Sequence, residues 1–308
     1  MPEPVSVSPV SVSVVMPTEA RADRAGLLRR ALESVCSQQG VRAIPIVVVN
    51  GPAAEPAVLA ELGRSRVVEL VRLEAADFPA ALRAGRERVR SPYFAELDDD
   101  DELLPGALAA RVAAMEARPD VDVVVTRGYV DHQGRRELNV GDLEAFQADP
   151  VHALLDHNWL APCAGLFRTA TIGTEYFADL PPYLEWTYLG LRLALDRRIL
   201  FLDQPTWIYR ADTPGSLSKR PRYVLQQAAS LDRLLRLPLP KMVRRGFERR
   251  RGLALHAAAG LELRAGRSRA AWGWHLRSLA AAGGWRYALY TRRLVYALWR
   301  AAADEPVR

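Results

Sequence analysis

The chain has 308 residues, 49% of them apolar and 25% charged, a composition typical of a globular protein that buries a sizeable core. Its two cysteines exclude a disulfide framework and favour a reducing compartment, and no segment reaches the roughly 18 uninterrupted apolar residues that a membrane span needs. Because residues 1–15 lack the pattern of a signal peptide, we expect a cytoplasmic protein, either soluble or peripheral at the inner face of the membrane.

The net charge of +6 is distributed unevenly along the chain. Residues 241–308 contain 15 Lys and Arg against 4 Asp and Glu, a net charge of +11, which leaves −5 for residues 1–240. An acidic part followed by a strongly basic part is typical of two regions with different roles. We therefore predict one domain over residues 1–220 and a second domain, basic and rich in aromatic residues, over residues 221–308.

Over the first 115 residues, apolar and β-branched runs alternate with amphipathic segments. This alternation predicts an α/β fold in which a mainly parallel sheet lies between helices. The expected strands cover residues 12–16, 44–49, 67–73 and 93–97. The expected helices cover residues 23–35, with Asp23 as the N-cap, and residues 57–62, 79–89 and 105–115.

Beyond residue 115 the pattern becomes mixed and then helical. Strands are expected at residues 121–130, 164–168, 199–202 and 206–209, with a hairpin turn at 131–134 and a helix at 183–196. After residue 220 the periodicity predicts helices only, at 223–236, 241–265, 268–281 and 285–302. The sequence thus predicts a sheet domain with a C-terminal helical appendage.

Five consecutive carboxylates at residues 98–102 directly follow the expected strand 93–97. Like charges this close repel one another unless a cation or hydrogen-bond donors offset the repulsion. A divalent ion held by one or two carboxylates and by the phosphates of a substrate would do so. Thr18 and Asn50 stand at the ends of two other expected strands, and ligands of parallel sheets bind beyond such ends. The alternative is a solvated acidic turn that caps the next helix.

Several segments, taken in order, resemble the landmarks of a family 2 glycosyltransferase with the GT-A fold, over about residues 12–218. Residues 97–101 are similar to the Asp-x-Asp motif of that family, and the other landmarks are residues 14–18, 47–51, 164–168, 184–186 and 207–210. The resemblance implies a metal-dependent, inverting, hexosyltransferase-like enzyme. Such an enzyme moves a sugar from a nucleotide-sugar donor to a saccharide, lipid-linked or other small acceptor.

By the same resemblance, Thr18 and Asn50 contact the nucleoside of the donor. Asp98 lies near the ribose or the sugar, Asp99 is also among the donor-binding residues, and Asp100 binds the divalent metal, Mn²⁺ or Mg²⁺, at the diphosphate. The metal neutralises the charge that the leaving nucleoside diphosphate gathers. Asp99 and the two acids after Asp100 have an alternative role, because they can also shape the turn and cap the helix.

Two arginines complete the implied donor site. Arg210 is implied to bind the diphosphate. Leu82 stands where the family has an arginine, and Arg83, one place along, is its candidate replacement, although a surface position on the helix explains Arg83 equally well. The loop at residues 213–219 is expected to close over the donor.

Glu185 is the candidate general base, because counting back from Arg192 puts it at or beside the family's base position, where Asp is usual. The alternative is that Glu185 only favours the N-terminus of its helix. Trp159 and Trp186 are tentative acceptor-binding residues, since aromatic faces stack on sugars, and core packing explains them equally well.

Residues 241–308 interleave Arg with Trp and Tyr, a pattern with which peripheral helices bind an anionic membrane surface. The alternatives are an acidic carrier, a partner subunit such as a second copy, or packing of the aromatic residues on the main domain. No motif supports nucleic-acid binding. Two further functions stay open: a catalytically degenerate homologue that binds nucleotide or a partner without turnover, and a docking protein that acts through its basic tail.

Overall fold

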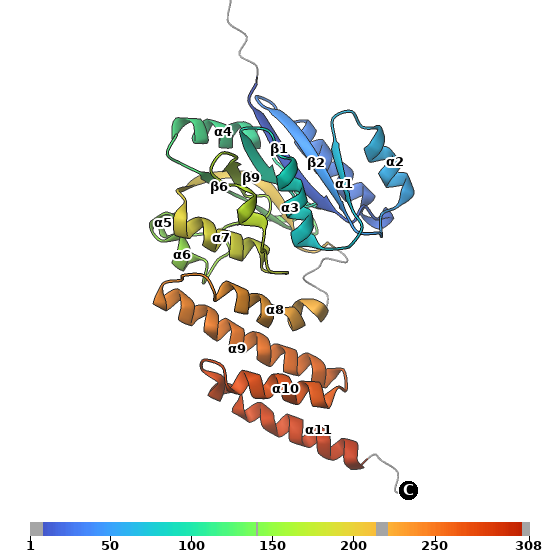
Figure 1. Ribbon diagram of the computed structural model, residues 1–308, viewed down its shortest axis with the longest axis vertical. Helices are drawn as coiled ribbons and strands as arrows, with labels where there is room; N and C mark the ends of the chain where they lie inside the picture. The colour runs from blue at the N-terminus through green and yellow to red at the C-terminus, as the bar shows by residue number, and fades with distance from the viewer. Residues whose placement is uncertain (1–8, 140, 214–220, 304–308) are drawn as a thin grey trace, which may run out of the picture. The chain divides into compact units, whose positions relative to one another are not determined.

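The computed structural model describes residues 9–139, 141–213 and 221–303 (Figure 1). The chain forms two compact units, each with its own buried core. Unit 1 comprises Met1–Leu180 and Glu185–Pro214, and unit 2 comprises Pro181–Leu184 and Gly215–Arg308. The predicted donor-covering loop, residues 213–219, and the predicted boundary at residue 220 lie outside the described residues, apart from Thr213 at the start of the loop.

Unit 1 is built on a nine-stranded mixed sheet with the strand order β3-β2-β1-β4-β8-β6-β9-β5, and β7 pairs with β6. The first four strands in this order are mutually parallel, whereas β8 runs antiparallel to both β4 and β6. The strands are β1 (Ser11–Thr18), β2 (Arg42–Asn50), β3 (Glu69–Leu73), β4 (Tyr93–Glu96), β5 (Glu102–Leu103), β6 (Val123–His132), β7 (Arg135–Leu138), β8 (Gly165–Arg168) and β9 (Ile199–Arg210). The α/β fold with a mixed sheet is confirmed.

The helices of unit 1 follow the strands along the chain and cover the sheet (Figure 1). They are α1 (Ala25–Cys36), α2 (Pro56–Arg64), α3 (Phe78–Arg88), α4 (Ala107–Ala117), α5 (Leu143–Ala148), α6 (Pro150–Ala153) and α7 (Glu185–Asp196), with the 3-10 helices η1 (Ala22–Arg24) and η2 (Thr174–Phe177). Helix α3 approaches β1 closely at Gly85, where a Cβ atom would lie 2.2 Å from Cγ1 of Val15. The core includes β1 and β2, whose residues 12–16 and 46–49 are almost completely buried.

Two local predictions in unit 1 were wrong, and one strand was missed. Residues 199–202 and 206–209 belong to one strand, β9, because its pairing with β6 continues through a register irregularity near Arg127 despite the polar residues and proline between them. Strand β5, of two residues, was too short to be predicted and pairs antiparallel with β9. Asp23 is not an N-cap, since it lies in η1 and bonds to Arg21 at 2.6 Å.

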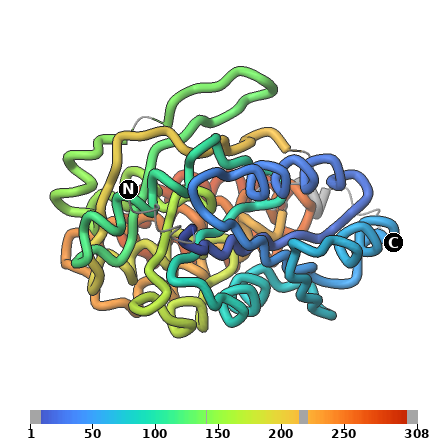
Figure 2. The backbone as a smooth tube through the Cα atoms, turned by 90° about the horizontal axis from the view of Figure 1, so that it is seen from above, coloured from blue at the N-terminus to red at the C-terminus, as the bar shows by residue number. Residues whose placement is uncertain are grey.

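The hairpin of β6 and β7 extends away from the body of unit 1, as the green loop in Figure 2 shows. All four residues of β7 are exposed. The hairpin turn occurs where the sequence predicted it, between His132 and Arg135.

Unit 2 is helical, and its successive helices pack each on the next (Figure 1). They are α8 (Pro221–Leu234), α9 (Lys241–Arg264), α10 (Ser268–Leu279), η4 (Gly284–Tyr290) and α11 (Thr291–Ala303). The predicted helix 285–302 is divided, because residues 284–290 form a 3-10 segment after Gly283, which adopts a left-handed conformation. Within the described residues, no helix is long and apolar enough to cross a membrane.

Candidate active site

The carboxyl ends of β1, β2 and β4 meet at one edge of the sheet, because these strands are parallel and β1 lies between the other two. Thr18 ends β1, Asn50 ends β2, and the acidic residues 98–102 follow β4. The Oγ1 atom of Thr18, a buried side chain, donates a hydrogen bond to Oδ2 of Asp99 at 2.5 Å. The structure thus brings Thr18 and the aspartates together, as the positions of the strand ends predicted.

Arg24 is the cation of this cluster, and sequence reasoning missed it. Its Nη2 atom donates to Oδ1 of Asp99 and lies 3.3 Å from Oδ2 of Asp100. Burial opposes the charge of Arg24, but hydrogen bonding and attraction to the two aspartates outweigh it and raise the pKa of Arg24. Arg24 lies in the short connection between β1 and α1, directly before the first residue of the helix. A basic residue in this connection, near the carboxyl end of β1, is the sequence signal that would have identified Arg24.

Asp98 is half-buried, and no hydrogen bond or ion pair among the described residues involves its carboxylate. Burial and the charges of the neighbouring Asp101 and Asp100 raise its pKa well above the ordinary range. Asp101 is fully buried, and its Oδ1 atom accepts a hydrogen bond of 2.9 Å from the backbone nitrogen of Arg210. Asp98 therefore presents carboxylate oxygens to which no described residue donates, whereas one oxygen of Asp101 is bound by the backbone of β9.

Arg210 ends β9 and lies among three acidic side chains. It donates to the Oε1 atom of Glu102 and lies 3.5 Å from the Oδ2 atom of Asp131, in addition to its backbone bond to Asp101. The pairing of β5 with β9 makes these contacts possible, because it places Glu102 opposite Ile208. The predicted diphosphate-binding arginine thus lies beside the aspartate run and is paired with acids there.

Asn50 connects the end of β2 with the start of α3. Its side chain is buried, and its Oδ1 atom accepts a hydrogen bond of 2.7 Å from the backbone nitrogen of Asp77, the N-cap of α3. Gly51 follows with φ +92°, and a Cβ atom there would lie 2.8 Å from Cβ of Ala76. The Nδ2 atom of Asn50 bonds to no described residue, so it remains a donor for a ligand.

Two predicted site residues make their contacts elsewhere. Arg83 lies on the exposed side of α3, where its Nε atom is 3.8 Å from Oε1 of Glu87. Trp159 is buried, donates from Nε1 to the carbonyl oxygen of Pro150 at 2.8 Å and packs edge-on against Phe201, although it also lines a cavity of about 250 Å³. These contacts match the alternatives that the sequence left open, a surface position for Arg83 and core packing for Trp159.

Glu185 is the first residue of α7 and is buried, with an exposed fraction of 8%. A carboxylate at this position is favoured by the partial positive charge of a helix N-terminus. Trp186, the next residue, is half-buried. Arg192 does not pair with Glu185 but donates to the carbonyl oxygen of Glu175 at 2.7 Å. The start of α7 agrees with both roles considered for Glu185, the general base and the favoured helix start.

The carboxylates of the aspartate cluster fit a divalent metal whose coordination would be completed by a bound ligand. Among the described residues, no group of three His, Cys, Asp or Glu side chains is arranged to hold a metal ion by itself. Mg²⁺ and similar ions are commonly bound by one or two carboxylates together with substrate phosphates, and Asp98 and Asp100 supply such carboxylates. Burial and the repulsion of neighbouring aspartates raise the pKa of Asp98, and a bound cation would relieve the repulsion.

Comparisons with known proteins identify the family and the fold of the chain. Residues 13–170, just over half of the chain, match the family described as glycosyl transferase family 2. No curated protein sequence matches the chain.

Two solved structures with bound donors show the same fold. The mannosyltransferase PcManGT from Pyrobaculum calidifontis, in complex with GDP-Man and Mn²⁺, is 15% identical, with a TM-score of 0.56 over 97% of this chain and 89% of that chain. TarS 1-349 from S. aureus, in complex with UDP-GlcNAc, is 14% identical, with a TM-score of 0.54 over 82% of this chain and 72% of that chain. At these identities the likeness concerns the fold, and it confirms the GT-A fold.

Proposed function

Because the chain belongs to glycosyl transferase family 2, we propose that it transfers a hexose from a nucleotide-sugar donor to an acceptor, with a divalent metal and with inversion at the anomeric carbon. One observation carries the proposal. The Thr18 hydroxyl donates a hydrogen bond to Asp99, so the aspartates lie beside Thr18 at the carboxyl ends of the adjacent parallel strands β1 and β4. Structures of the same fold hold UDP-GlcNAc in one case and GDP-Man with Mn²⁺ in another.

In this proposal the edge of the sheet binds the donor. Thr18 and Asn50 lie at the ends of β1 and β2, and the Nδ2 atom of Asn50, which bonds to no described residue, would donate to the base or the ribose. Asp98 accepts hydrogen bonds from the ribose or the sugar. Asp99 holds the position of Thr18 and Arg24 and is the least accessible of the three acids that face the donor.

Asp100 would hold the metal, with Asp98 beside it. When bound, the metal would act as a Lewis acid that stabilises the negative charge developing on the leaving nucleoside diphosphate. Arg24 forms an ion pair with Asp100, and Arg210 forms one with Glu102. Both arginines add positive charge at this edge of the sheet. Most of the rate enhancement would come from this electrostatic arrangement and from the orientation of the donor.

Glu185 would accept the proton of the attacking acceptor hydroxyl, as inverting transfer requires a base. Glu185 is buried and is the first residue of α7, so its backbone position is fixed by the helix. Trp186, half-buried beside it, offers an aromatic face for an acceptor sugar. Trp159 is the second acceptor candidate, at the wall of its cavity.

A transfer and hydrolysis assay with UDP- and GDP-sugars, in Mn²⁺ and in EDTA, tests the proposal. We expect turnover only with metal, and a loss of about 100-fold or more in Asp98→Asn, Asp100→Asn and Glu185→Gln. Asp179→Asn is the matched control, because Asp179 is exposed and bonds to no described residue. If wild type and control turn over no nucleotide sugar, the enzyme proposal is wrong.

The second candidate function is a homologue that binds nucleotide without turnover. The ion pairs of Arg24 with Asp99 and Asp100 favour it, since they already neutralise part of the charge that a metal would meet. In that case nucleotide diphosphates raise the melting temperature by mass action, and no sugar is released. Measuring melting and turnover on the same samples separates the two functions.

A further inference from the structure

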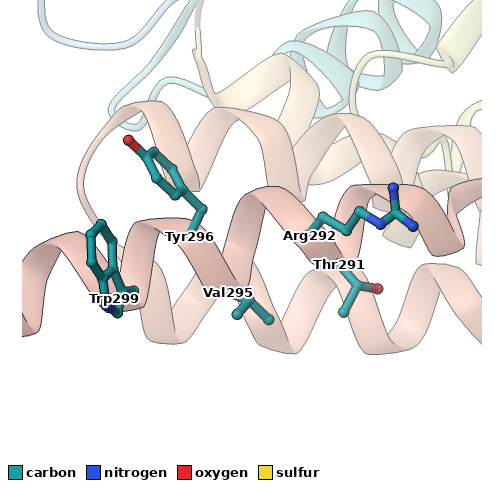
Figure 3. Close-up of a pocket in the computed structure, with 5 residues that line it drawn as sticks. All are labelled: Thr291, Arg292, Val295, Tyr296 and Trp299. Carbon is teal, nitrogen blue, oxygen red and sulfur yellow. The ribbon is translucent and has the colours of Figure 1, made fainter.

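Helix α11 presents a stripe of large side chains to solvent. Val295, Tyr296 and Trp299 are 52%, 57% and 66% exposed, and with Thr291 and Arg292 they line a pocket of about 410 Å³ (Figure 3). Positions 292, 295, 296 and 299 have the i, i+3, i+4, i+7 spacing of a single helix face. The rings of Tyr296 and Trp299 lie 6.0 Å apart, so the stripe is continuous on this face.

This stripe is not the side by which α11 packs within unit 2. Among the residues of α11 whose side chains are described, Leu294 is the fully buried one, and it lies next to the stripe in sequence but on another face. Trp285 and Leu289, in the preceding η4, are 78% and 73% exposed. Exposed large side chains that share one helix face, as those of the stripe do, mark an interaction site.

The segment that carries the stripe is basic and contains no acid. Residues 263–303 contain eight arginines and no Asp, Glu or Lys. Arg292 and Arg293 are exposed, and the guanidinium of Arg286 lies 6.0 Å from the ring centre of Trp285. A surface that complements this segment therefore has to be both negatively charged and able to take up aromatic rings.

We propose that the stripe of α11, with η4, docks on the surface of an anionic phospholipid membrane. Tyr and Trp side chains favour the headgroup region, and arginines are attracted to anionic lipids. Helix α11 has 13 residues, about 20 Å in length, which is shorter than the roughly 30 Å of a hydrocarbon core. The helix therefore lies in the interface, with Tyr296 and Trp299 toward the lipid.

A second copy of the chain suits this face less well. A symmetric dimer through α11 would bring two sets of arginines together, and residues 263–303 contain no carboxylate to offset their repulsion. A membrane offers apolar volume and negative charge together. Docking does not depend on sugar transfer, so the two proposals fail separately.

Co-sedimentation of the full chain with vesicles tests the docking. One set of vesicles contains phosphatidylcholine only, and the other contains phosphatidylcholine with phosphatidylglycerol. We expect binding to the anionic vesicles only, and about tenfold or greater weakening in the double variant Tyr296→Ser with Trp299→Ser. The double variant Arg292→Gln with Arg293→Gln tests the charge independently and should also bind more weakly.

Two matched controls lie on α9. Met242 and Leu253 are 60% and 57% exposed, and Arg245 and Arg249 are exposed and bond to no described residue. Met242→Ser with Leu253→Ser, and Arg245→Gln with Arg249→Gln, should bind vesicles as the wild type does.

Three results would overturn the proposal. In the first, the wild type sediments with neither kind of vesicle. In the second, the control variants weaken vesicle binding as much as the stripe variants do. In the third, the wild type binds no vesicles but forms a dimer in sedimentation velocity, and the Tyr296→Ser, Trp299→Ser variant is a monomer.

Discussion

At the scale of single residues, the most informative side chain is Arg24. It is mostly buried, bonds to Asp99 and lies 3.3 Å from Asp100, so the protein itself supplies a cation to the acidic cluster. A metal and a guanidinium compete for the same carboxylate charge. The charge balance of the site should therefore change when either one is removed.

We predict that Arg24→Ala lowers the free energy of unfolding in EDTA by about 1–3 kcal/mol, because it removes the cation that pairs with Asp99 and Asp100. Mn²⁺ should restore much of this loss, so that the metal-induced rise in melting temperature is larger in the variant than in the wild type. Thermal unfolding with and without Mn²⁺ measures both values. Arg21→Ala is the control, since Arg21 pairs with Glu19 and Asp23 instead. If Mn²⁺ raised the melting temperature equally in the wild type, Arg24→Ala and Arg21→Ala, Arg24 and the metal would not compete for the aspartates.

Glu96, the last residue of β4, is a second unusual side chain. Both of its carboxylate oxygens are buried without a hydrogen-bond partner among the described residues. Burial raises the pKa of Glu96 well above its usual range, and Arg86 only partly opposes this. Glu96 has its ordinary pKa in the unfolded chain and a higher pKa in the folded protein. At pH values between these two, the folded protein keeps a proton that the unfolded chain releases. Stability must then fall as the pH rises above the ordinary pKa of a glutamate.

We predict that this residue contributes a limiting slope of about 1.4 kcal/mol per pH unit to the loss of stability. Glu96→Gln keeps the shape and removes the titration, so it should be more stable than the wild type at neutral pH and vary less with pH. Urea unfolding between about pH 4 and pH 8 tests this. Glu33→Gln serves as the control, because Glu33 is exposed and its carboxylate bonds to no described residue. Parallel curves for Glu96→Gln and wild type would disprove the assignment.

At the scale of elements, the packing of α3 on β1 depends on one glycine. A Cβ atom at Gly85 would lie 2.2 Å from Cγ1 of Val15 and 3.2 Å from Cγ2 of Val48, and both valines are completely buried. Neither neighbour can move without displacing the core. Because Asn50 bonds to Asp77, the N-cap of α3, a shift of this helix also reaches the proposed donor site.

We predict that Gly85→Ala costs about 1–3 kcal/mol of stability through overpacking and weakens nucleotide binding as well. Gly63→Ala in α2 is the matched control, since a Cβ atom at Gly63 meets nothing within 4 Å and alanine favours a helix. Urea unfolding should show the first variant destabilised and the second unchanged or slightly stabilised. Equal stabilities would mean that α3 can move away from β1 at no cost.

The elements also show what the sequence could predict and what it could not. The buried runs of β1 and β2 are nearly uninterrupted apolar stretches, so their strands and the carboxyl ends at Thr18 and Asn50 were predictable. Strand β9 contains Asp203 and Pro205, which indicate a break, and only the pairing with β6 carries the strand through them. The contacts of Arg210 with Glu102 and Asp131 join segments distant in sequence, and no local pattern reports such contacts.

At the scale of the whole molecule, the two units have separate cores. We therefore predict two unfolding transitions in calorimetry. A nucleoside diphosphate with Mn²⁺ should raise only the transition of unit 1, because a ligand stabilises the unit that binds it. EDTA should abolish this rise. A single transition that moves as a whole would show that the units unfold together.

Residues 263–303, which contain no Asp or Glu, also determine which conditions can control the proposed attachment of unit 2 to a membrane. Arginine remains charged at every physiological pH. His275, the one histidine between residues 263 and 303, is completely buried, and burial lowers its pKa. The positive charge of this segment is therefore constant in the cell. Its attachment would respond to ionic strength and to the proportion of anionic lipid, and acidification of the surroundings would leave it unchanged.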